Sequence, residues 1–312
     1  SGSSSGGGGG GGSSNSRFSV LNKQLIQQDT AKNVLQLLAS TKGALSSQGG
    51  GGVLSTVNFS TSIHRLARHM TLYTSKHKAG NERSHILSDP KFALLICSTS
   101  EALLEGAESM RSSQHNYYRH TANNSNSNAS NSNASNSNTS TSKKQFEARN
   151  LANIAWAIAK INIAPPSTVV PVDLDNAESL LRQKAQQVRA LIMEIAKQRN
   201  TRASSSSTST STSTSNSDST ASNSWIPALS ELCGLLIDTI SVKALQLNPK
   251  QFQQQELSNL MWSLATAQRP NKNVYDFVVQ SMVASAKQRS NDTQNKKRHT
   301  HSSSSSSSRN AL

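Results

Sequence analysis

Apolar residues recur at helical spacing in two segments that have nearly the same sequence. The segment "NLANIAWAIAK" covers residues 150–160, and "ELSNLMWSLAT" covers residues 256–266. The two segments align so that Trp156 falls on Trp262, although the chain has only three Trp residues. This coincidence, together with the shared helical period, indicates an internal repeat.

Each copy predicts an amphipathic helix with a broad apolar arc. At 100° per residue, Trp156 and Trp262 lie at the edge of that arc. An arc of this width suits a helix that has neighbours on two sides, and its small Ala and Ser residues permit those neighbours to approach closely. The opposite strip of the two helices consists of Asn153, Ala157, Lys160, Asn259, Ser263 and Thr266.

A third and more divergent copy, "FSTSIHRLARHM", covers residues 59–70. Its apolar positions form a similar arc, and His64 takes the place of the Trp. The polar strip of this copy is expected to hold Thr61, Arg65 and Arg68. The chain therefore uses the same helical phrase at least three times, with a polar strip that varies between the copies.

Further amphipathic segments separate the three copies, and none has the alternation that is typical of a strand. Pro90 is expected in an early turn of one of these helices, where its missing N–H is tolerated. These patterns predict an all-α fold of stacked helix–turn–helix units, which is an α-solenoid. The additional predicted helices cover residues 32–40, 85–110, 177–199, 225–245 and 273–289.

Only 34% of the 312 residues are hydrophobic, and four segments consist largely of Gly, Ser, Asn or Thr. Those segments have too little apolar surface to offset the ~1–2 kcal/mol per residue that ordering a backbone costs, so they are predicted to be disordered. The predicted organisation is a Gly/Ser tail (1–16), a helical repeat block (17–120), an Asn/Ser insertion (121–142), a second block (143–202), a Ser/Thr insertion (203–224), a third block (225–289) and a basic Ser-rich tail (290–312).

The formal net charge is +15, and basic residues exceed acidic ones in all three helical blocks. A polyanion is the usual partner of such a chain. Nucleic acid is expected rather than a membrane, because no segment offers ~18 consecutive apolar residues. Cys97 and Cys233 lie within apolar helical patterns and are expected to be buried, reduced thiols, which suits a reducing compartment.

The repeated phrase resembles the Leu-Ala-Asn-x-x-Trp-Ala-x-Ala-Lys signature of octotricopeptide repeats and of the related FAST-kinase-like helical repeats. Together with "KNVLQLLAS" and "VNFSTSIHRLAR", it is similar to the repeat domain that is grouped with subunits of the RNA-editing substrate-binding complex. The resemblance covers the three helical blocks. It implies binding of organellar RNA, through which mitochondrial or plastid transcripts are stabilised, processed, edited or translated.

Two kinds of side chain in the repeats have both a binding and a structural interpretation. Trp156 and Trp262 could stack on unpaired bases, but their position at the margin of the apolar arc favours wedging between adjacent helices. Asn153 and Asn259 could pair with the edges of bases. Alternatively, they could hold one repeat to the next through a hydrogen bond to a neighbouring backbone.

Arg65, Arg68 and Lys160 lie on the same strip as these amides and are predicted to contact phosphates, with a solvated helix face as the alternative. The predicted RNA-binding residues are therefore Arg65, Arg68, Asn153, Lys160 and Asn259. Weaker candidates of the same kind are Arg182, Lys184 and Arg189.

The sequence offers no catalytic or metal-binding constellation. His64, His69, His77 and His85 provide no pair at i and i+4 on one helix face, and no Cys lies near them. The glycines at 49–52 are not followed by the Gly-Lys-Ser/Thr of a phosphate loop. No catalytic residue, metal or cofactor is predicted.

The sequence therefore predicts a non-catalytic helical repeat protein that binds single-stranded RNA along a basic face. The expected location is a mitochondrion or, alternatively, a plastid. Other RNA-processing proteins are further candidate partners, and no membrane association is expected. The alternative function is an armadillo-like scaffold that grips a protein partner.

Overall fold

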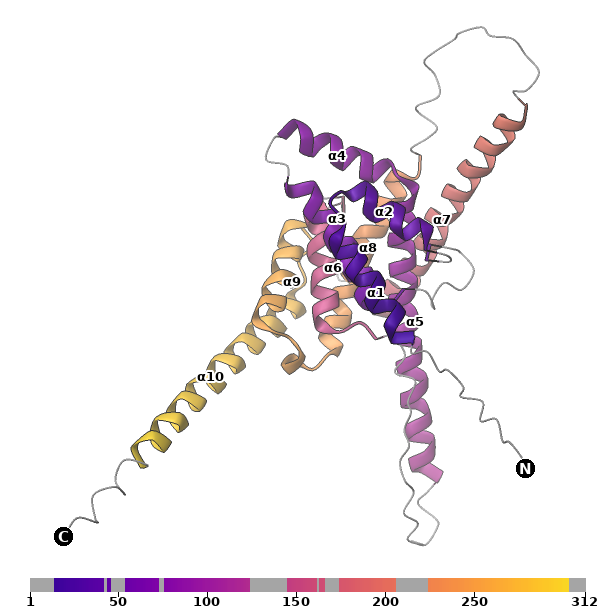
Figure 1. Ribbon diagram of the computed structural model, residues 1–312. Coiled ribbons are helices and arrows are strands. Elements are labelled where there is room, and N and C mark those ends of the chain that lie inside the picture. The colour runs from indigo at the N-terminus through magenta and orange to yellow at the C-terminus, as the bar shows by residue number, and fades with distance from the viewer. Residues whose placement is uncertain are drawn as a thin grey trace, which may run out of the picture.

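The computed structural model describes residues 14–41, 44–45, 54–72, 76–123, 145–161, 163–165, 174–205 and 224–302. Within these ranges the chain is helical and contains no strand, which confirms the predicted all-α fold. The helices stack in layers as an α-solenoid (Figure 1). They are α1 (Ser14–Gln27), α2 (Ala31–Ser40), α3 (Thr56–Leu72), α4 (Lys76–Ser88), α5 (Pro90–Asn123), α6 (Ala148–Ile161), α7 (Leu174–Ser205), α8 (Ile226–Gln246), the short 3-10 helix η5 (Pro249–Gln251), α9 (Gln254–Thr266) and α10 (Lys272–Ser302).

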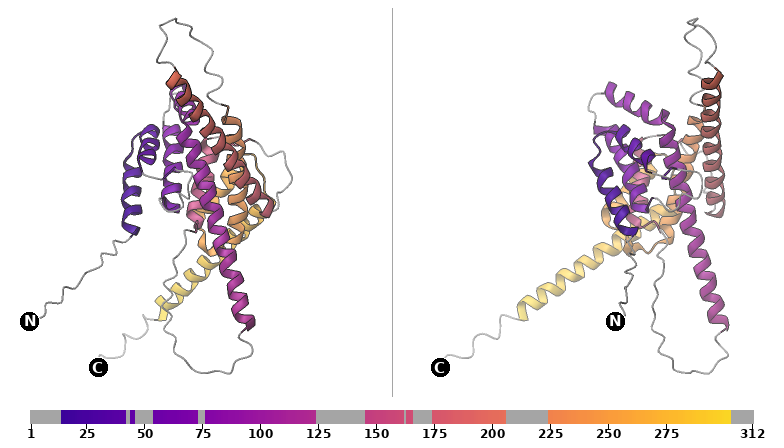
Figure 2. Two further views of the ribbon diagram at one scale, coloured as in Figure 1. Left: turned by 90° about the vertical axis from the view of Figure 1, so that its right-hand side faces the viewer. Right: turned by 45° about the vertical axis from the view of Figure 1, so that its right-hand side comes forward.

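Four helices form a row across the molecule. α6 packs against α3 on one side and against α9 on the other, and α1 packs against α3 (Figure 1). A second layer contains α5, α7 and α8, which pack against one another, while α8 also contacts α6. Figure 2 shows α5 and α7 side by side, on the opposite side of the molecule from α1. The three copies of the repeated phrase are thus adjacent helices of one row.

Each repeat helix begins two residues after a large buried side chain. Leu54, Phe146 and Phe252 precede α3, α6 and α9 in this way, and their exposed fractions are 0%, 4% and 6%. An apolar residue just before a helix fixes the angle at which the chain enters it. The Phe146 ring lies 6.5 Å from the ring of Phe59 in α3, between centroids, so the start of α6 is anchored on the preceding repeat.

Polar side chains cap two of these helix starts at aligned positions. In α3, Ser55 Oγ accepts a bond from the backbone N–H of Asn58 at 3.2 Å, and Asn58 Oδ1 accepts one from the backbone N–H of Ser55 at 3.1 Å. In α9, the Glu256 carboxylate accepts a bond from the backbone N–H of Gln253 at 2.8 Å. These bonds satisfy N–H groups that the first turn of a helix leaves without a partner. The repeat therefore extends back to the caps.

Small residues, with Ile63 as the exception, line the side of α3 and α6 that faces the next helix of the row. These positions are buried on α3 and α6, where they are Thr56, Ser60, Ile63, Ala67, Ala148, Ala152, Ala155 and Ala159. The aligned positions on α9 are Gln254, Ser258, Met261 and Ala265. Met261 is half-buried and the other three are exposed, because the described part of the chain places no further row helix beside α9. The row is closely packed inside and open at α9.

The helix predicted over residues 85–110 is in fact two helices. α4 ends at Ser88 and α5 begins at Pro90. A proline disfavours the helical conformation in the residue before it, and it suits the first position of a helix because it lacks an N–H. The carboxylate of Asp89 accepts a bond from the backbone N–H of Lys91 at 2.9 Å and so caps the new helix. Pro90 therefore starts a helix instead of lying in the early turn of a longer one.

Several helices continue into segments that the sequence predicts to be disordered. α10 does not end near Arg289 but runs on to Ser302. Its first half is packed, so the costly nucleation step is already complete and each further residue only adds one bond to an existing helix. Helices also reach into the predicted low-complexity segments as far as Ser14, Asn123 and Ser205. The remainder of those segments, at 1–13, 124–142, 206–223 and 303–312, lies outside the described residues.

Ion pairs of low exposure join different helices of the fold. Arg269, which follows α9, donates from Nε to Asp238 Oδ1 of α8 at 2.8 Å and from Nη1 to the carbonyl of Pro165 at 2.8 Å. Gly234 of α8 makes room for this guanidinium, since a Cβ at that position would lie 2.6 Å from Arg269 Nη1. Two similar pairs are Arg189–Glu101 and Lys243–Glu178.

Candidate nucleic-acid interface

Three aromatic side chains, one from each repeat helix, form a continuous row across α3, α6 and α9. The centroid of the His64 ring lies 5.0 Å from that of Trp156, with the planes tilted by 35°. The centroid of Trp156 lies 6.2 Å from that of Trp262, with a tilt of 36°. These separations are those of aromatic rings in direct contact. His64, Trp156 and Trp262 are termed the aromatic row below.

The aromatic row joins the repeats at aligned positions. Trp156 is half-buried and has an aromatic neighbour on each side, so it links its helix to both neighbouring repeats. Trp262 stands at the end of the row and is 39% exposed. Because neighbouring rings touch, no gap between them admits a flat ligand. A ligand can approach the rings only from their exposed sides.

α6 exposes one narrow line of side chains. Arg149, Asn153, Trp156 and Lys160 are the residues of this helix that are not buried, and their spacing places them along one face. Ala157, which is predicted on the polar strip, is buried because α6 has α3 and α9 on its two sides and α8 behind it. The exposed line is therefore rotated toward Trp156, and it includes Arg149, a cation that was not predicted from the sequence.

The exposed line continues on the two neighbouring repeat helices. The aligned positions there are exposed or half-buried and consist of Val57, Thr61, His64, Arg68, Gln255, Asn259, Trp262 and Thr266. Together with the four residues of α6 they are termed the outer strip. Ser263, which is predicted on this face, is buried. Across the three helices the outer strip presents a line of amide or hydroxyl groups, then the aromatic row, then cations or a hydroxyl, and none of its residues is acidic.

Arg68 and Lys160 lie one helical turn beyond the aromatic row and are exposed. Lys160 Nζ is 5.6 Å from the ring centroid of Trp262, a cation–π contact with the next repeat. Within the described residues, neither cation has an Asp or Glu at salt-bridge distance. Both charges are therefore available to an anionic ligand.

Arg65, a predicted phosphate contact, is turned toward the end of α1 instead. Its Nη2 donates to the carbonyl of Gln28, and His69 Nε2 lies 3.1 Å from the same oxygen. Arg65 is half-buried, and its Nε is buried without a hydrogen-bond partner in the described structure. It aligns with the buried Ala157 and so holds α3 to α1. The structure thus brings Arg68, Asn153, Lys160 and Asn259 to one face and leaves Arg65 off it.

The imidazole of His64 is uncharged at neutral pH. Burial, followed by the positive charges of Arg68 and Arg65, lowers the pKa of His64 below its ordinary value of 6.5. Burial and Arg65 also lower the pKa of His69, although its contact with the Gln28 carbonyl opposes this shift. His64 therefore contributes a ring, not a charge, to the outer strip at pH 7.

The hydrogen bonds that tie the first two repeat helices to the preceding helix come from amides that were not predicted to do so. Asn58 Nδ2 donates to the carbonyl of Phe18 in α1 at 3.1 Å, and Asn150 Nδ2 donates to Thr56 Oγ1 in α3 at 3.4 Å. Both amides are buried and occupy aligned positions. The bond between repeats, which was an alternative role for the outer-strip amides, is therefore made three residues earlier. The sequence signal for these bonds was the Asn that recurs at aligned positions near the start of α3 and α6, as Asn58 and Asn150.

The weaker cationic candidates on α7 do not form a second strip. Arg189 is buried and pairs with both carboxylate oxygens of Glu101, at 3.1 Å and 2.8 Å. Lys184 bonds to Glu231 of α8, whereas Arg182 is exposed. The charges of Arg189 and Lys184 are thus balanced within the fold.

The cysteines lie in the interior. Cys97 and Cys233 are both buried and unpaired. Burial raises the pKa of Cys97 to about 12 and raises that of Cys233 as well. A thiol in this state is a small apolar side chain rather than a nucleophile or a metal ligand.

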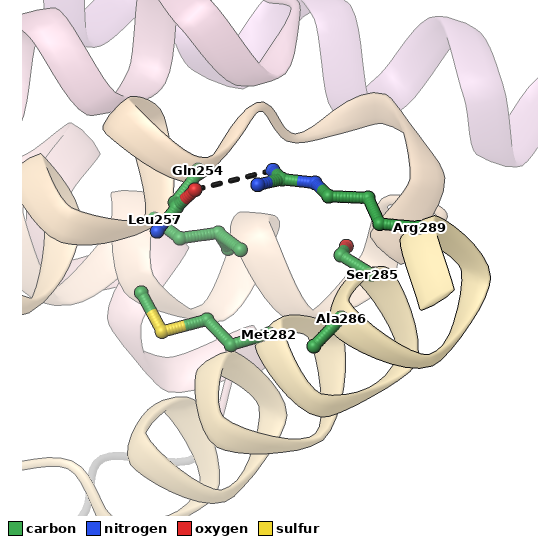
Figure 3. A pocket seen from close by; sticks show the side chains of 6 residues that line it. All are labelled: Gln254, Leu257, Met282, Ser285, Ala286 and Arg289. Carbon is green, nitrogen blue, oxygen red and sulfur yellow. Dashed lines mark hydrogen bonds between the residues drawn. The ribbon is translucent and has the colours of Figure 1, made fainter. Parts of the chain in front are cut away.

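The part of the chain that the structure describes gives little support for a metal site, a membrane-spanning helix or a small-molecule pocket. There, no three His, Cys, Asp or Glu side chains gather where a metal could be held, and no helix combines the length and hydropathy needed to span a bilayer. A cavity of about 70 Å³ lies between α9 and α10, bridged by a 3.1 Å bond from Arg289 Nη2 to Gln254 Oε1 (Figure 3). It is much smaller than the ~300–1,000 Å³ that is usual for a small-molecule pocket.

Comparisons with protein-family models, with curated proteins and with solved structures find no match to this chain. The resemblance to octotricopeptide and FAST-kinase-like repeats therefore stays a prediction that rests on the repeated phrase. The candidate interface rests on the geometry of the outer strip.

Proposed function

We propose that this chain is a non-catalytic helical repeat protein that binds single-stranded RNA along the outer strip. The observation that supports this function is the arrangement of the aromatic row, with two cations and a hydroxyl on one side, two amides and a hydroxyl on the other, and no acidic residue among them. The net charge of +15 favours a polyanionic ligand in addition. A double helix, in contrast, keeps its base faces inaccessible to aromatic side chains.

Binding would combine two kinds of contact. Arg68, Arg149 and Lys160 attract phosphates and release counterions from the nucleic acid, which provides affinity that does not depend on sequence. Asn153 and Asn259 each offer a donor and an acceptor to the edges of unstacked bases. Because the repeats lie side by side, the strand would cross the helices and meet one repeat after another. Occupancy alone would then shield the RNA from nucleases or present it to processing enzymes.

The organellar part of the proposal rests on the family resemblance. It assigns the chain to a mitochondrion or plastid, where it would act in RNA processing, stability, editing or translation. Imaging the tagged endogenous protein together with mitochondrial and plastid markers tests this assignment. A purely cytosolic or nuclear signal would remove it without affecting RNA binding.

Fluorescence anisotropy with labelled oligouridine, at several salt concentrations, tests RNA binding by the full chain. The double variant R68A/K160A removes two cations of the outer strip, while K32A/K250A removes two exposed cations elsewhere and is the matched control. Each lost phosphate contact should reduce the slope of log affinity against log salt by about 0.7 for a single strand. The first variant should therefore lose roughly 1.4 from the slope, and the control should lose none.

Two results would contradict the proposal. Absence of measurable binding by the unaltered chain at low salt would remove the function itself. Equal losses in R68A/K160A and K32A/K250A would leave a basic protein that binds RNA through diffuse charge and would remove the outer strip as its site.

An armadillo-like protein scaffold is the second candidate, because α10 carries exposed apolar side chains. Val279 and Val283, four residues apart, are 56% and 48% exposed. A partner held by such apolar contacts would keep its affinity as salt rises, whereas RNA affinity should fall steeply between low and moderate salt. The same salt titration therefore separates the two functions.

A further inference from the structure

The two tryptophans of the aromatic row have different surroundings. Trp156 has a ring on each side, His64 from α3 and Trp262 from α9. The aromatic and cationic neighbours of Trp262 within the described residues, Trp156 and Lys160, both come from α6. Trp262 also lies on the last helix of the row and is 39% exposed. A large ring with this much exposure is unusual inside a repeat array that buries Trp225 to 2%.

We propose that Trp262 is the stacking platform for one nucleobase of the bound strand, and that Lys160 transfers from the Trp262 ring to the neighbouring phosphate when the strand binds. This inference rests on the proposed RNA-binding function and deepens it. It assigns recognition of a base to one ring, while Trp156 and His64 serve to join the repeats. The ligand class is a single-stranded nucleotide unit consisting of a base, a sugar and a phosphate.

The geometry supplies both halves of this exchange. In the free protein the Lys160 ammonium lies 5.6 Å from the Trp262 centroid, a contact that is weak at an exposed site. An ammonium interacts more strongly with a phosphate than with a ring, because full opposite charges attract each other. The Lys160 side chain is long and exposed, so it can exchange one partner for the other by rotating its side-chain bonds. The ring face then becomes accessible to a base, whatever its identity, since every base has a π-face.

The test compares three variants of the full chain with oligouridine of about 12 nucleotides and with an abasic sugar–phosphate oligomer of the same length. W262L removes the π-face but keeps an apolar side chain, and W262F keeps a smaller π-face. V279A truncates another exposed apolar side chain, on α10, and is the matched control. Circular dichroism establishes that each variant is folded.

For the unaltered chain and V279A, oligouridine should bind roughly 10-fold more tightly than the abasic oligomer. In W262L this preference should disappear while the slope of affinity against salt is retained, and W262F should keep most of the preference. A further variant, K160Q, tests the transfer of the cation. For K160Q, the slope of log affinity against log salt should decrease in magnitude by about 0.7, because one phosphate contact is lost.

The inference and the function on which it rests fail in different ways. If W262L prefers oligouridine as strongly as the unaltered chain does, Trp262 is not the platform, and RNA binding along the outer strip stands. If K160Q leaves the slope unchanged, the transfer of Lys160 is wrong. If the unaltered chain binds neither oligomer at low salt, both the inference and the proposed function fall.

Discussion

Single side chains determine how the repeats meet one another. The first copy of the phrase has His64 where the others have Trp, and this smaller ring still contacts Trp156 at 5.0 Å. The replacement adds a titratable group to a surface that is otherwise charged by Arg and Lys. In α6, Asn153 lies three residues before Trp156, and its amide faces outward. Asn150 lies three residues before Asn153, and its amide faces the preceding helix α3. Neighbouring amides of one helix thus have separate roles.

The buried amide of Asn150 should contribute measurably to stability. N150A removes the bond to Thr56 and leaves a hole in the contact between α6 and α3. We expect the free energy of unfolding to fall by about 1–2 kcal/mol in urea denaturation, because a buried donor and its partner lose each other. N153A is the matched control and should change it by less than about 0.5 kcal/mol, since that amide lies on the outer strip. Equal losses of unfolding free energy in N150A and N153A would show that the bond between Asn150 and Thr56 does not stabilise the fold.

RNA affinity should depend on pH through His64. Its pKa in the free protein lies below 6.5, so the ring gains a proton only as the pH falls below that value. The added charge beside Arg68 strengthens attraction to phosphate, and bound phosphate in turn raises the pKa of the ring. Anisotropy measurements from pH 7.5 down to pH 5.5 should show affinity rising, and H64N should flatten the rise. A rise that persists in H64N would assign the effect to another group.

At the scale of helices, the sequence predicts best where apolar residues recur at the helical period. The helices at 32–40 and 225–245 agree with α2 and α8 to within one residue at each end. α1 and the first turns of α4 were not predicted. The α4 segment carries few apolar residues, and both helices are held by contacts with α3. Only tertiary packing decides such cases.

The candidate site could be predicted in part for the same reason. The helical period places Asn153, Lys160 and Arg68 on one side, and they do lie together on the outer strip. It also places Ala157 and Arg65 there, but these face neighbouring helices. The period of a single helix fixes the angle between its residues but not the direction in which its neighbours lie. Those neighbours, brought together from distant parts of the chain, determine which edge of the polar strip stays exposed.

The connection between α9 and α10 should be stabilised by Arg269. R269A removes the pair with Asp238 and the bond to Pro165, and we expect a loss of about 3 kcal/mol in the free energy of unfolding, because it leaves a poorly exposed carboxylate without its partner. K272A is the matched control, since the Lys272–Asp276 pair is 84% and 51% exposed and should contribute less than about 0.5 kcal/mol.

G234A tests the same site from its other side. The new Cβ would lie 2.6 Å from Arg269 Nη1 and would force the guanidinium to move. In the R269A background the guanidinium is absent, so G234A should cost much less there than in the unaltered chain. Additive losses would mean that Gly234 and Arg269 act independently.

At the scale of the whole molecule, each row helix depends on its neighbours, so the position of a repeat in the row should matter. Trp156 contacts rings on both sides, whereas Trp262 has a ring neighbour on one side only among the described residues. W156A should therefore lower the free energy of unfolding by about 3 kcal/mol, the lower end for truncating a Trp, because the ring is half-buried. W262A should cost less than half as much.

Urea denaturation followed by far-ultraviolet circular dichroism measures both variants. One shared transition is expected for the unaltered chain and for W262A, because α6 connects α3, α8 and α9. If W262A loses more unfolding free energy than W156A does, the contacts of Trp156 in the middle of the row are not the more stabilising ones.

The exposed side of α9, with Gln254, Ser258, Met261 and Ala265, has a consequence for protein engineering. The positions that permit close approach in α3 and α6 recur there, with small side chains at Ser258 and Ala265, and Arg289 of α10 bonds to Gln254 at one end of this side. A duplicate of residues 145–161, joined with its supporting helices beyond α10, would find a complementary surface on that side. Trp262 would then become an interior ring, and the added Trp would become the new terminal one. The footprint on RNA would lengthen by one module for each duplicate added.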